Sequence, residues 1–128
     1  MKFKNENIEQ LKTTINYIKN YKYNLFLLNG HIGAGKTTFV RYFLSNELVS
    51  SPTYTLVNDY ENALHLDLYR IDYLPIDPEE LLCEKSYGNE SKKIFIEWAQ
   101  KYDFSPFPNK CYLLFHNKEI IMSNTIIQ

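Results

Sequence analysis

The residues best suited to do chemistry form a glycine-rich stretch that ends in lysine and threonine. In order they are Gly30, His31, Ile32, Gly33, Ala34, Gly35, Lys36 and Thr37. They fit the pattern G-x-x-x-x-G-K-[ST]. Glycines let backbone N–H groups turn inward around phosphate oxygens. Lys36 can then reach the β- and γ-phosphates and Thr37 can bind Mg²⁺. The pattern therefore predicts a P-loop, which binds the phosphates of a nucleotide.

The elements around this stretch are those that a P-loop requires. The apolar run over 23–29 predicts a buried strand whose two faces are both covered. After the loop, apolar residues recur on one face of a predicted helix over 36–46. The N-terminus of that helix adds a favourable dipole charge near the phosphates. This context favours a nucleotide site over an accidental glycine-rich turn.

Carboxylates at strand ends are the second requirement, because a nucleotide hydrolase needs an acid that holds Mg²⁺ directly or through water. Glu97 follows the apolar run 93–96, and Asp67 lies in the alternating run 65–69. Glu97 is the predicted metal ligand, with a solvated acid at a strand end as the alternative. Asp67 is predicted to support the site, with an outward position or a salt bridge to Arg70 as the alternative.

A nucleotide switch also needs a hydroxyl group on a loop that can sense the γ-phosphate. Thr53 follows Pro52 in a turn-forming sequence and is the candidate, with a plain turn as the alternative. Arg70 can neutralise charge in phosphoryl transfer, but pairing with a nearby aspartate is the favoured role. Trp98, beside Glu97, can either stack on a base or fill the core.

The remaining pattern predicts one α/β domain over residues 1–128. The other predicted elements are an amphipathic helix over 5–21, hairpin strands over 55–60 and 63–69, a helix that starts at Asp77, a strand over 93–96, and a terminal hairpin over 111–116 and 120–127. The three histidines, His31, His65 and His116, are scattered and lack ligand spacing, so no metal role is predicted for them.

Composition adds weaker constraints. A net charge of −1 gives no overall attraction to nucleic acid or membrane. Residues 1–41 hold seven Lys/Arg against two Asp/Glu, whereas residues 59–84 hold eight Asp/Glu against one Arg. This separation is typical of two solvated faces, and the alternatives are an acidic surface for a basic partner or carboxylates near Mg²⁺.

The cellular compartment is predicted from cysteine usage and from apolar runs. Cys83 and Cys111 lack metal-ligand spacing and are predicted to be free thiols in a reducing cytosol. The N-terminus has no apolar signal segment, and no apolar run approaches the ~20 residues that span a bilayer. The expected location is cytoplasmic, with no membrane contact.

Five motifs occur in order between residues 25 and 98, at 30–39, 51–60, 65–70, 77–81 and 96–98. Apart from the P-loop, which here includes Thr38, each is weak alone, but the five in order are specific. They resemble the TsaE family, formerly YjeE, the ATPase of bacterial tRNA threonylcarbamoyladenosine biosynthesis. His31 stands where that family usually has Asp, Ala99 where Pro is common, and the C-terminal part looks shorter.

The resemblance implies a P-loop NTPase fold with a mixed, mostly parallel sheet, flanking helices and antiparallel C-terminal strands. It implies binding of ATP and Mg²⁺, weak hydrolysis alone, and docking onto the TsaB–TsaD pair, with tRNA involved only indirectly. The ATP cycle would support repeated turnover of that pair. By family role, Thr37 and Glu97 hold Mg²⁺, Thr53 belongs to the switch, and Asp67 supports the site.

Three other functions fit part of the pattern. A small nucleotide or metabolite kinase shares the P-loop but usually carries an Arg-rich lid, and this chain has no Arg cluster. A regulatory GTPase needs an Asn-Lys-x-Asp motif, and residues 109–112 and 117–120 both lack the Asp. An ATP-gated binding module, in which hydrolysis is incidental, stays open.

Overall fold

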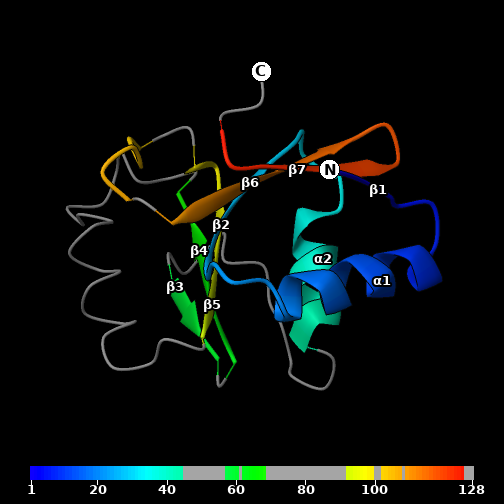
Figure 1. Ribbon diagram of the computed structural model, residues 1–128, viewed down its shortest axis with the longest axis horizontal. Coiled ribbons are helices and arrows are strands. Elements are labelled where there is room, and N and C mark those ends of the chain that lie inside the picture. The colour runs from blue at the N-terminus through cyan, green and yellow to red at the C-terminus, as the bar shows by residue number, and fades with distance from the viewer. Residues whose placement is uncertain (45–56, 61, 69–91, 100–101, 108, 126–128) are drawn as a thin grey trace.

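The computed structural model describes residues 1–44, 57–60, 62–68, 92–99, 102–107 and 109–125. In this part of the chain, two helices lie against one face of a seven-stranded sheet (Figure 1). The helices are α1 (Ile8–Lys19) and α2 (Lys36–Leu44). The strands are β1 (Lys2–Lys4), β2 (Leu25–Asn29), β3 (Val57–Asp59), β4 (Ala63–Asp67), β5 (Lys93–Glu97), β6 (Lys110–His116) and β7 (Glu119–Ser123).

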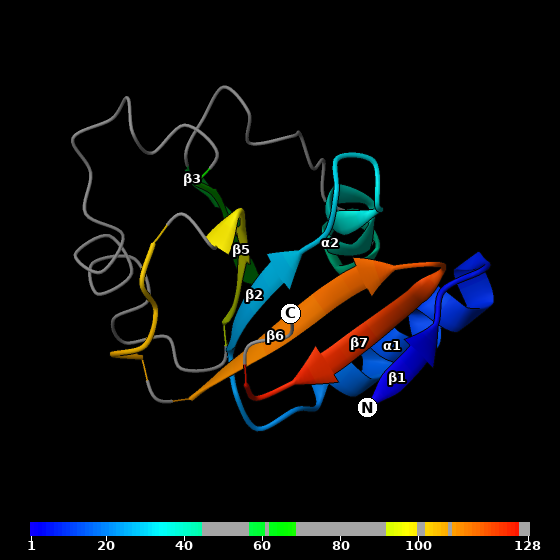
Figure 2. The ribbon, with the colours of Figure 1, turned by 90° about the horizontal axis from the view of Figure 1, so that it is seen from above.

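The sheet has the strand order β1-β7-β6-β2-β5-β4-β3 (Figure 2). The four central strands, β6, β2, β5 and β4, run parallel. Antiparallel partners close both edges, where β7 and β1 follow β6 and β3 follows β4. The prediction of a mixed α/β sheet with an antiparallel C-terminal hairpin is confirmed. The expected parallel strands are the four at the centre, and the three antiparallel pairs all lie toward the edges of the sheet.

Strand β2 lies at the centre of the sheet, and its first four residues are apolar, as expected for a strand with both faces covered. Phe26 and Leu28 join the core cluster that includes the helices, whereas Leu25 and Leu27 join a cluster on the opposite face. All four side chains are buried. The alternation of side chains along a strand thus divides this one run between two cores.

Helix α1 starts after Asn7, whose side chain accepts a hydrogen bond of 2.9 Å from the backbone N–H of Gln10. This N-cap satisfies an N–H group that has no partner within the helix. The cap fixes the start of α1 at Ile8, and the helix ends at Lys19, so it is shorter than the predicted 5–21. Leu11 and Ile15 bury their side chains against the sheet, as the spacing predicts, but Ile8 at the first turn is 48% exposed.

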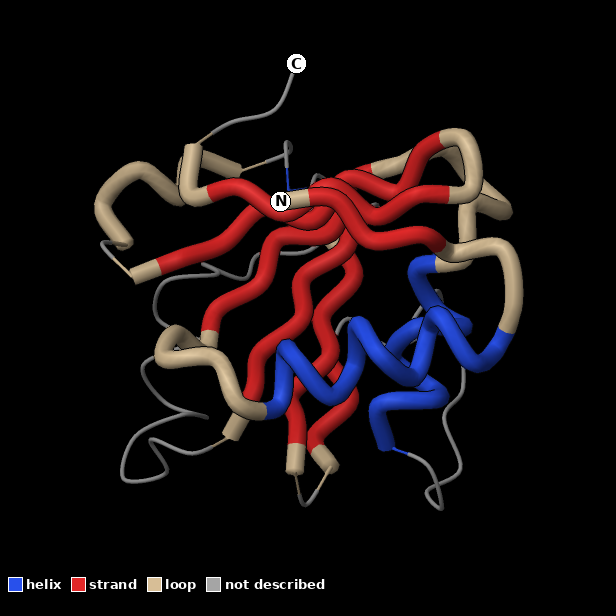
Figure 3. Tube along the Cα trace, turned by 45° about the vertical axis from the view of Figure 1, so that its right-hand side comes forward, coloured by secondary structure: helices blue, strands red, loops and turns tan. Residues whose placement is uncertain are grey.

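Helix α2 is held on the sheet by aromatic packing. The ring of Phe39 meets those of Phe95 and Phe115 edge-on, at centroid distances of 5.7 and 5.6 Å. Phe43 packs on Phe95 in the same way, at 4.9 Å. Edge-to-face pairs of this kind add to the stabilisation from burial. They hold both ends of α2 against β5 and β6, and Figure 3 shows both helices on the same side of the strands.

The opposite face of the sheet is covered, within the described ranges, by the chain that follows β5. Ala99 and Phe104, which follow β5, pack on a cluster that contains Leu66 and Ile96. The prediction of flanking helices is therefore confirmed for one face. The predicted helix at Asp77 lies outside the described residues.

Lys93 is a buried ammonium group that ties β5 to the chain before β2. Its Nζ donates hydrogen bonds to the carbonyl oxygens of Tyr21 (2.8 Å) and Tyr23 (2.9 Å) and to Oδ1 of Asn24 (2.8 Å). Burial lowers the pKa of Lys93 from its ordinary value. The three acceptors match the three donors of an ammonium group, so the buried side chain is fully satisfied.

We expect Lys93→Met to lower the free energy of unfolding by about 2–3 kcal/mol, because three buried or half-buried acceptors then lose their donor. Urea denaturation followed by circular dichroism measures the change. Lys12→Met, at an exposed position of α1, is the matched control and should stay within about 0.5 kcal/mol of the parent protein. Equal losses in the two variants would contradict a structural role for this lysine.

Candidate functional site

Three parallel strands bring the predicted site residues to one edge of the sheet. In the register of the strands, Leu28 of β2 lies beside Glu97 of β5, and Glu97 lies beside Asp67 of β4. The glycine-rich loop leaves β2 at Gly30, so it begins next to Glu97, and Asp67 lies one strand further away. Ligands in open α/β sheets bind outside the carboxyl ends of the strands, which is where these residues meet.

Close packing against β6 makes glycine necessary at the first position of the loop. Gly30 has a φ of 151°, and a Cβ there would lie 2.9 Å from the carbonyl oxygen of Phe115 and 3.2 Å from the Cβ of Ala34. The backbone N–H of Ala34 donates to the carbonyl oxygen of His31 at 3.1 Å, which closes a tight turn. The loop is therefore a compact structure backed by β6.

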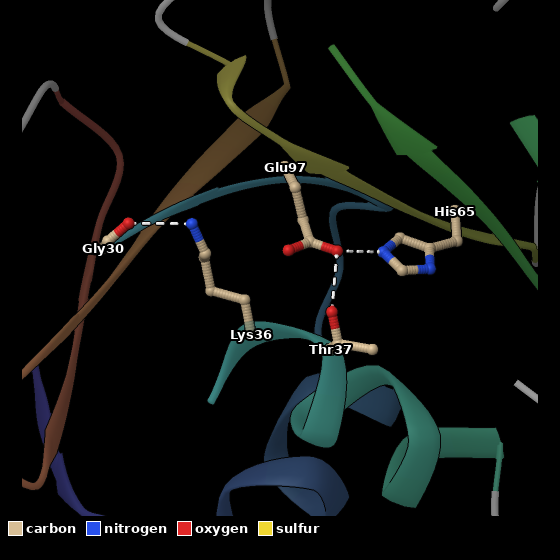
Figure 4. Close-up of polar contacts among 5 residues, drawn as sticks. All are labelled: Gly30, Lys36, Thr37, His65 and Glu97. Carbon is tan, nitrogen blue, oxygen red and sulfur yellow. Dashed lines mark hydrogen bonds and ion pairs between the residues drawn. The ribbon is translucent and has the colours of Figure 1, made fainter. Parts of the chain in front are cut away.

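Lys36 reaches back across this loop (Figure 4). Its Nζ donates a 2.7 Å hydrogen bond to the carbonyl oxygen of Gly30 and lies 4.9 Å from the ring centre of Trp98. The residue is only 6% exposed. Burial lowers the pKa of Lys36, and the negative charges of Glu97 and Asp67 oppose that change. The loop thus encloses an ammonium group that an anion would stabilise in its charged form.

Glu97, at the end of β5, connects the sheet to the start of α2. Its Oε2 accepts a hydrogen bond from the hydroxyl group of Thr37 at 3.3 Å and contacts Nε2 of His65 at 2.5 Å (Figure 4). Glu97 is 5% exposed and His65 is fully buried. Thr37 and Glu97, the two predicted metal ligands, therefore lie within hydrogen-bond distance of each other, and Asp67 lies on the neighbouring strand in register with Glu97.

His65 is the site residue that sequence reasoning missed. The sequence predicts no role for it, because the three histidines lack the spacing of metal ligands. The alternating run 65–69 does place His65 and Asp67 on the same face of a strand. What was lacking is the register between β4 and β5, which no local pattern provides and which brings His65 to Glu97.

A cavity of about 300 Å³ adjoins the loop. His31, Gly33 and Ala34 line one side, and residues 115–119 of the β6–β7 hairpin line another. Trp98 is not among the lining residues, and its half-buried indole packs beside the second core cluster and over Lys36. Of its two predicted roles, core packing is the one for which the structure shows contacts, while base stacking stays a prediction.

Thr53 and Arg70 lie outside the described residues, so the predicted switch and the role of the arginine stay predictions. Among the residues that are described, no group of three or more His, Cys, Asp or Glu side chains is arranged to hold a metal ion. Thr37 and Glu97 offer a hydroxyl and a carboxylate oxygen, which are ligand types that Mg²⁺ takes together with water and phosphate oxygens.

None of the helices in the described ranges is long and apolar enough to cross a bilayer.

Comparison with known proteins agrees with the motif order. The family model described as "Threonylcarbamoyl adenosine biosynthesis protein TsaE" matches residues 4–124. Proteins named "tRNA threonylcarbamoyladenosine biosynthesis protein TsaE" are similar over shorter spans. The one from Haemophilus influenzae is 44% identical over 84 residues, which cover 58% of this chain and 51% of that protein.

Two further relatives with the same name extend this similarity. The protein of Bacillus subtilis is 32% identical over 84 residues, which cover 59% of this chain and 51% of the relative. That of Rickettsia typhi is 36% identical over 103 residues, which cover 70% and 69%. The match spans about half the length of the first two relatives. Because the family model covers almost all of residues 1–128, the chain belongs to the TsaE family.

Proposed function

We propose that this chain binds ATP with Mg²⁺ and hydrolyses it in support of tRNA threonylcarbamoyladenosine biosynthesis, using a P-loop NTPase fold. The observation that carries the proposal is the meeting of Lys36, Thr37 and Glu97 at the glycine-rich loop. Family membership suggests the pathway, because the similar curated proteins are named for that biosynthesis.

In this proposal the loop and Lys36 bind the phosphates. The ammonium group exchanges the carbonyl oxygen of Gly30 for phosphate oxygens when a nucleotide enters. Backbone N–H groups at the start of α2 would donate to the same anion, and the helix would add its dipole. Burial lowers the pKa of Lys36, and the negative charge of the phosphates would favour its ammonium form.

Thr37 and Glu97 would hold Mg²⁺, which supplies positive charge that neutralises charge developing on the phosphates. The hydroxyl group of Thr37 has two acceptor sites and one donor, so it can bind a cation and still donate to Glu97. Asp67 lies beside Glu97 in register and would support the site with its negative charge.

The cavity beside the loop is the proposed site of the nucleoside. Its volume of about 300 Å³ is at the lower end of small-molecule sites. His31, which replaces the usual Asp of the family, lines this cavity. A neutral or cationic ring there would make the potential near the nucleotide less negative than a carboxylate would.

The proposed partner is the TsaB–TsaD pair, and tRNA would be involved only through it, in the cytoplasm. ATP with Mg²⁺ would order the segment around Thr53, and the partner would recognise that ordered surface. Hydrolysis would then release it. This behaviour would distinguish a true ATPase from an ATP-gated binding module. Only the ATPase would need to hydrolyse ATP to be released from the partner.

Calorimetric titration with ATP, ADP and GTP, each with and without Mg²⁺, tests the binding site. We expect ATP and ADP to bind more tightly with Mg²⁺ than without it. Release of inorganic phosphate is then measured with and without TsaB–TsaD, and we expect the partner to increase it. Lack of ATP binding would overturn the proposal, and so would ADP formation without release of phosphate, which indicates transfer to an acceptor.

A further inference from the structure

His65 is a buried histidine beside Glu97, the proposed Mg²⁺ ligand. The proposed function gives His65 no role. His65 is fully buried on β4, and its Nε2 lies 2.5 Å from Oε2 of Glu97. In the strand register, His65 faces Phe95, so Glu97 lies two residues further along the neighbouring strand. Residues two apart project from the same face of a strand, which brings the imidazole to the carboxylate.

We infer that His65 is a positioning residue that fixes the orientation of the Glu97 carboxylate for Mg²⁺. The inference rests on the proposed function, because it assigns a role toward the metal proposed there. It makes His65 neither a metal ligand nor a group that touches the nucleotide.

The hydrogen-bonding pattern at the ring supports this role. An ionised carboxylate only accepts hydrogen bonds, so Nε2 is the donor toward Glu97. The other nitrogen, Nδ1, is buried and has no hydrogen-bond partner. A proton on Nδ1 would be a buried donor without an acceptor, which is costly. The geometry therefore favours the tautomer with its proton on Nε2, aimed at Glu97.

These hydrogen bonds would also determine which oxygen of the Glu97 carboxylate is available to Mg²⁺. The hydrogen bonds from His65 and Thr37 both end on Oε2 of Glu97. The other oxygen, Oε1, lies on the side of Lys36 (Figure 4). Two donors on one oxygen hold the carboxyl group in a single orientation. Because Glu97 is only 5% exposed, few water molecules can compete for these hydrogen bonds. Hydrogen-bond partners of metal ligands orient those ligands and tune their affinity.

Three variants separate positioning from mere filling of the core. Leucine in His65→Leu fills the space but offers no donor. Glutamine in His65→Gln carries an amide N–H group near the position of Nε2, whereas asparagine in His65→Asn reaches only about as far as Nδ1. The readout is the fluorescence of Trp98, which is the single tryptophan of the chain and lies over Lys36. Each variant is titrated with Mg²⁺ at saturating ADP, and separately with ADP in the presence of a chelator.

We expect His65→Leu and His65→Asn to bind Mg²⁺ about 10- to 100-fold more weakly than the parent protein. His65→Gln should recover most of that affinity, and metal-free ADP affinity should be unchanged in all three. If His65→Leu fails to fold, the comparison of glutamine with asparagine still decides. Equal Mg²⁺ affinity in glutamine and asparagine variants would overturn the inference. Parent protein that binds ADP without any Mg²⁺ dependence would instead remove the proposed metal site itself.

Discussion

Lys36→Met is expected to weaken ATP binding about 100-fold or more, because a buried anion then loses its charged partner. Methionine keeps much of the apolar stem, which matters at a position that is only 6% exposed. The effect should be similar for ATP and ADP with or without Mg²⁺, since the ammonium group acts on the phosphates and not on the metal. Calorimetric titration of the variant against both nucleotides measures it.

The same substitution should do little harm to the free protein. Burial disfavours the charged form of Lys36, as its lowered pKa indicates, so removing the charge relieves a desolvation penalty while it costs the hydrogen bond to Gly30. We expect an unfolding midpoint close to that of the parent. Lys12→Met, at an exposed position, should change neither property. ATP binding at parental strength in Lys36→Met would show that the loop is not the phosphate site.

Glu97→Gln is expected to remove the Mg²⁺-dependent gain in ATP affinity and to lower partner-stimulated turnover about 100-fold or more. Glutamine keeps the shape and still offers an oxygen to Thr37 and His65, but it lacks the charge that holds a cation. Metal-free ATP affinity should be unchanged or slightly higher, because a negative charge near the phosphates has been removed. Phosphate release and Mg²⁺ titration measure the two effects.

Glu9→Gln is the matched control, since Glu9 is exposed in the first turn of α1. It should keep parental metal dependence and turnover. If Glu97→Gln also kept them, the metal would have to be held elsewhere. Comparison of the two variants is informative. Lys36→Met is expected to weaken binding in every nucleotide titration, whereas Glu97→Gln is expected to weaken it only in titrations that contain Mg²⁺.

Local sequence was sufficient to predict the elements that surround the candidate site. The glycine spacing, the apolar run before it and the helical run after it depend on neighbouring residues, and the structure has β2, the loop and α2 in that order. Glu97 was identified because it ends an apolar strand. Its closeness to Thr37 then follows from the parallel pairing of β2 and β5.

Long-range pairing explains what was not predicted. Strand β1 was missed because Lys2–Lys4 has no apolar run, and it exists through pairing with β7 at the other end of the chain. The role of His65 was missed for the same reason, since β4 meets β5 only in the folded sheet. β7 ends at Ser123 rather than at residue 127 as predicted. The predicted switch at Thr53 lies outside the described residues.

The short outer strands of the sheet constrain how a partner protein can attach. Among the described residues, the two outermost strands, β1 and β3, are each three residues long, and β1 carries exposed lysines at both of its ends. Adding a strand from another polypeptide needs a longer row of free backbone groups, and edge lysines oppose it. Recognition by another protein would then depend on side chains and loops, so surface substitutions should be able to abolish assembly without disturbing the backbone.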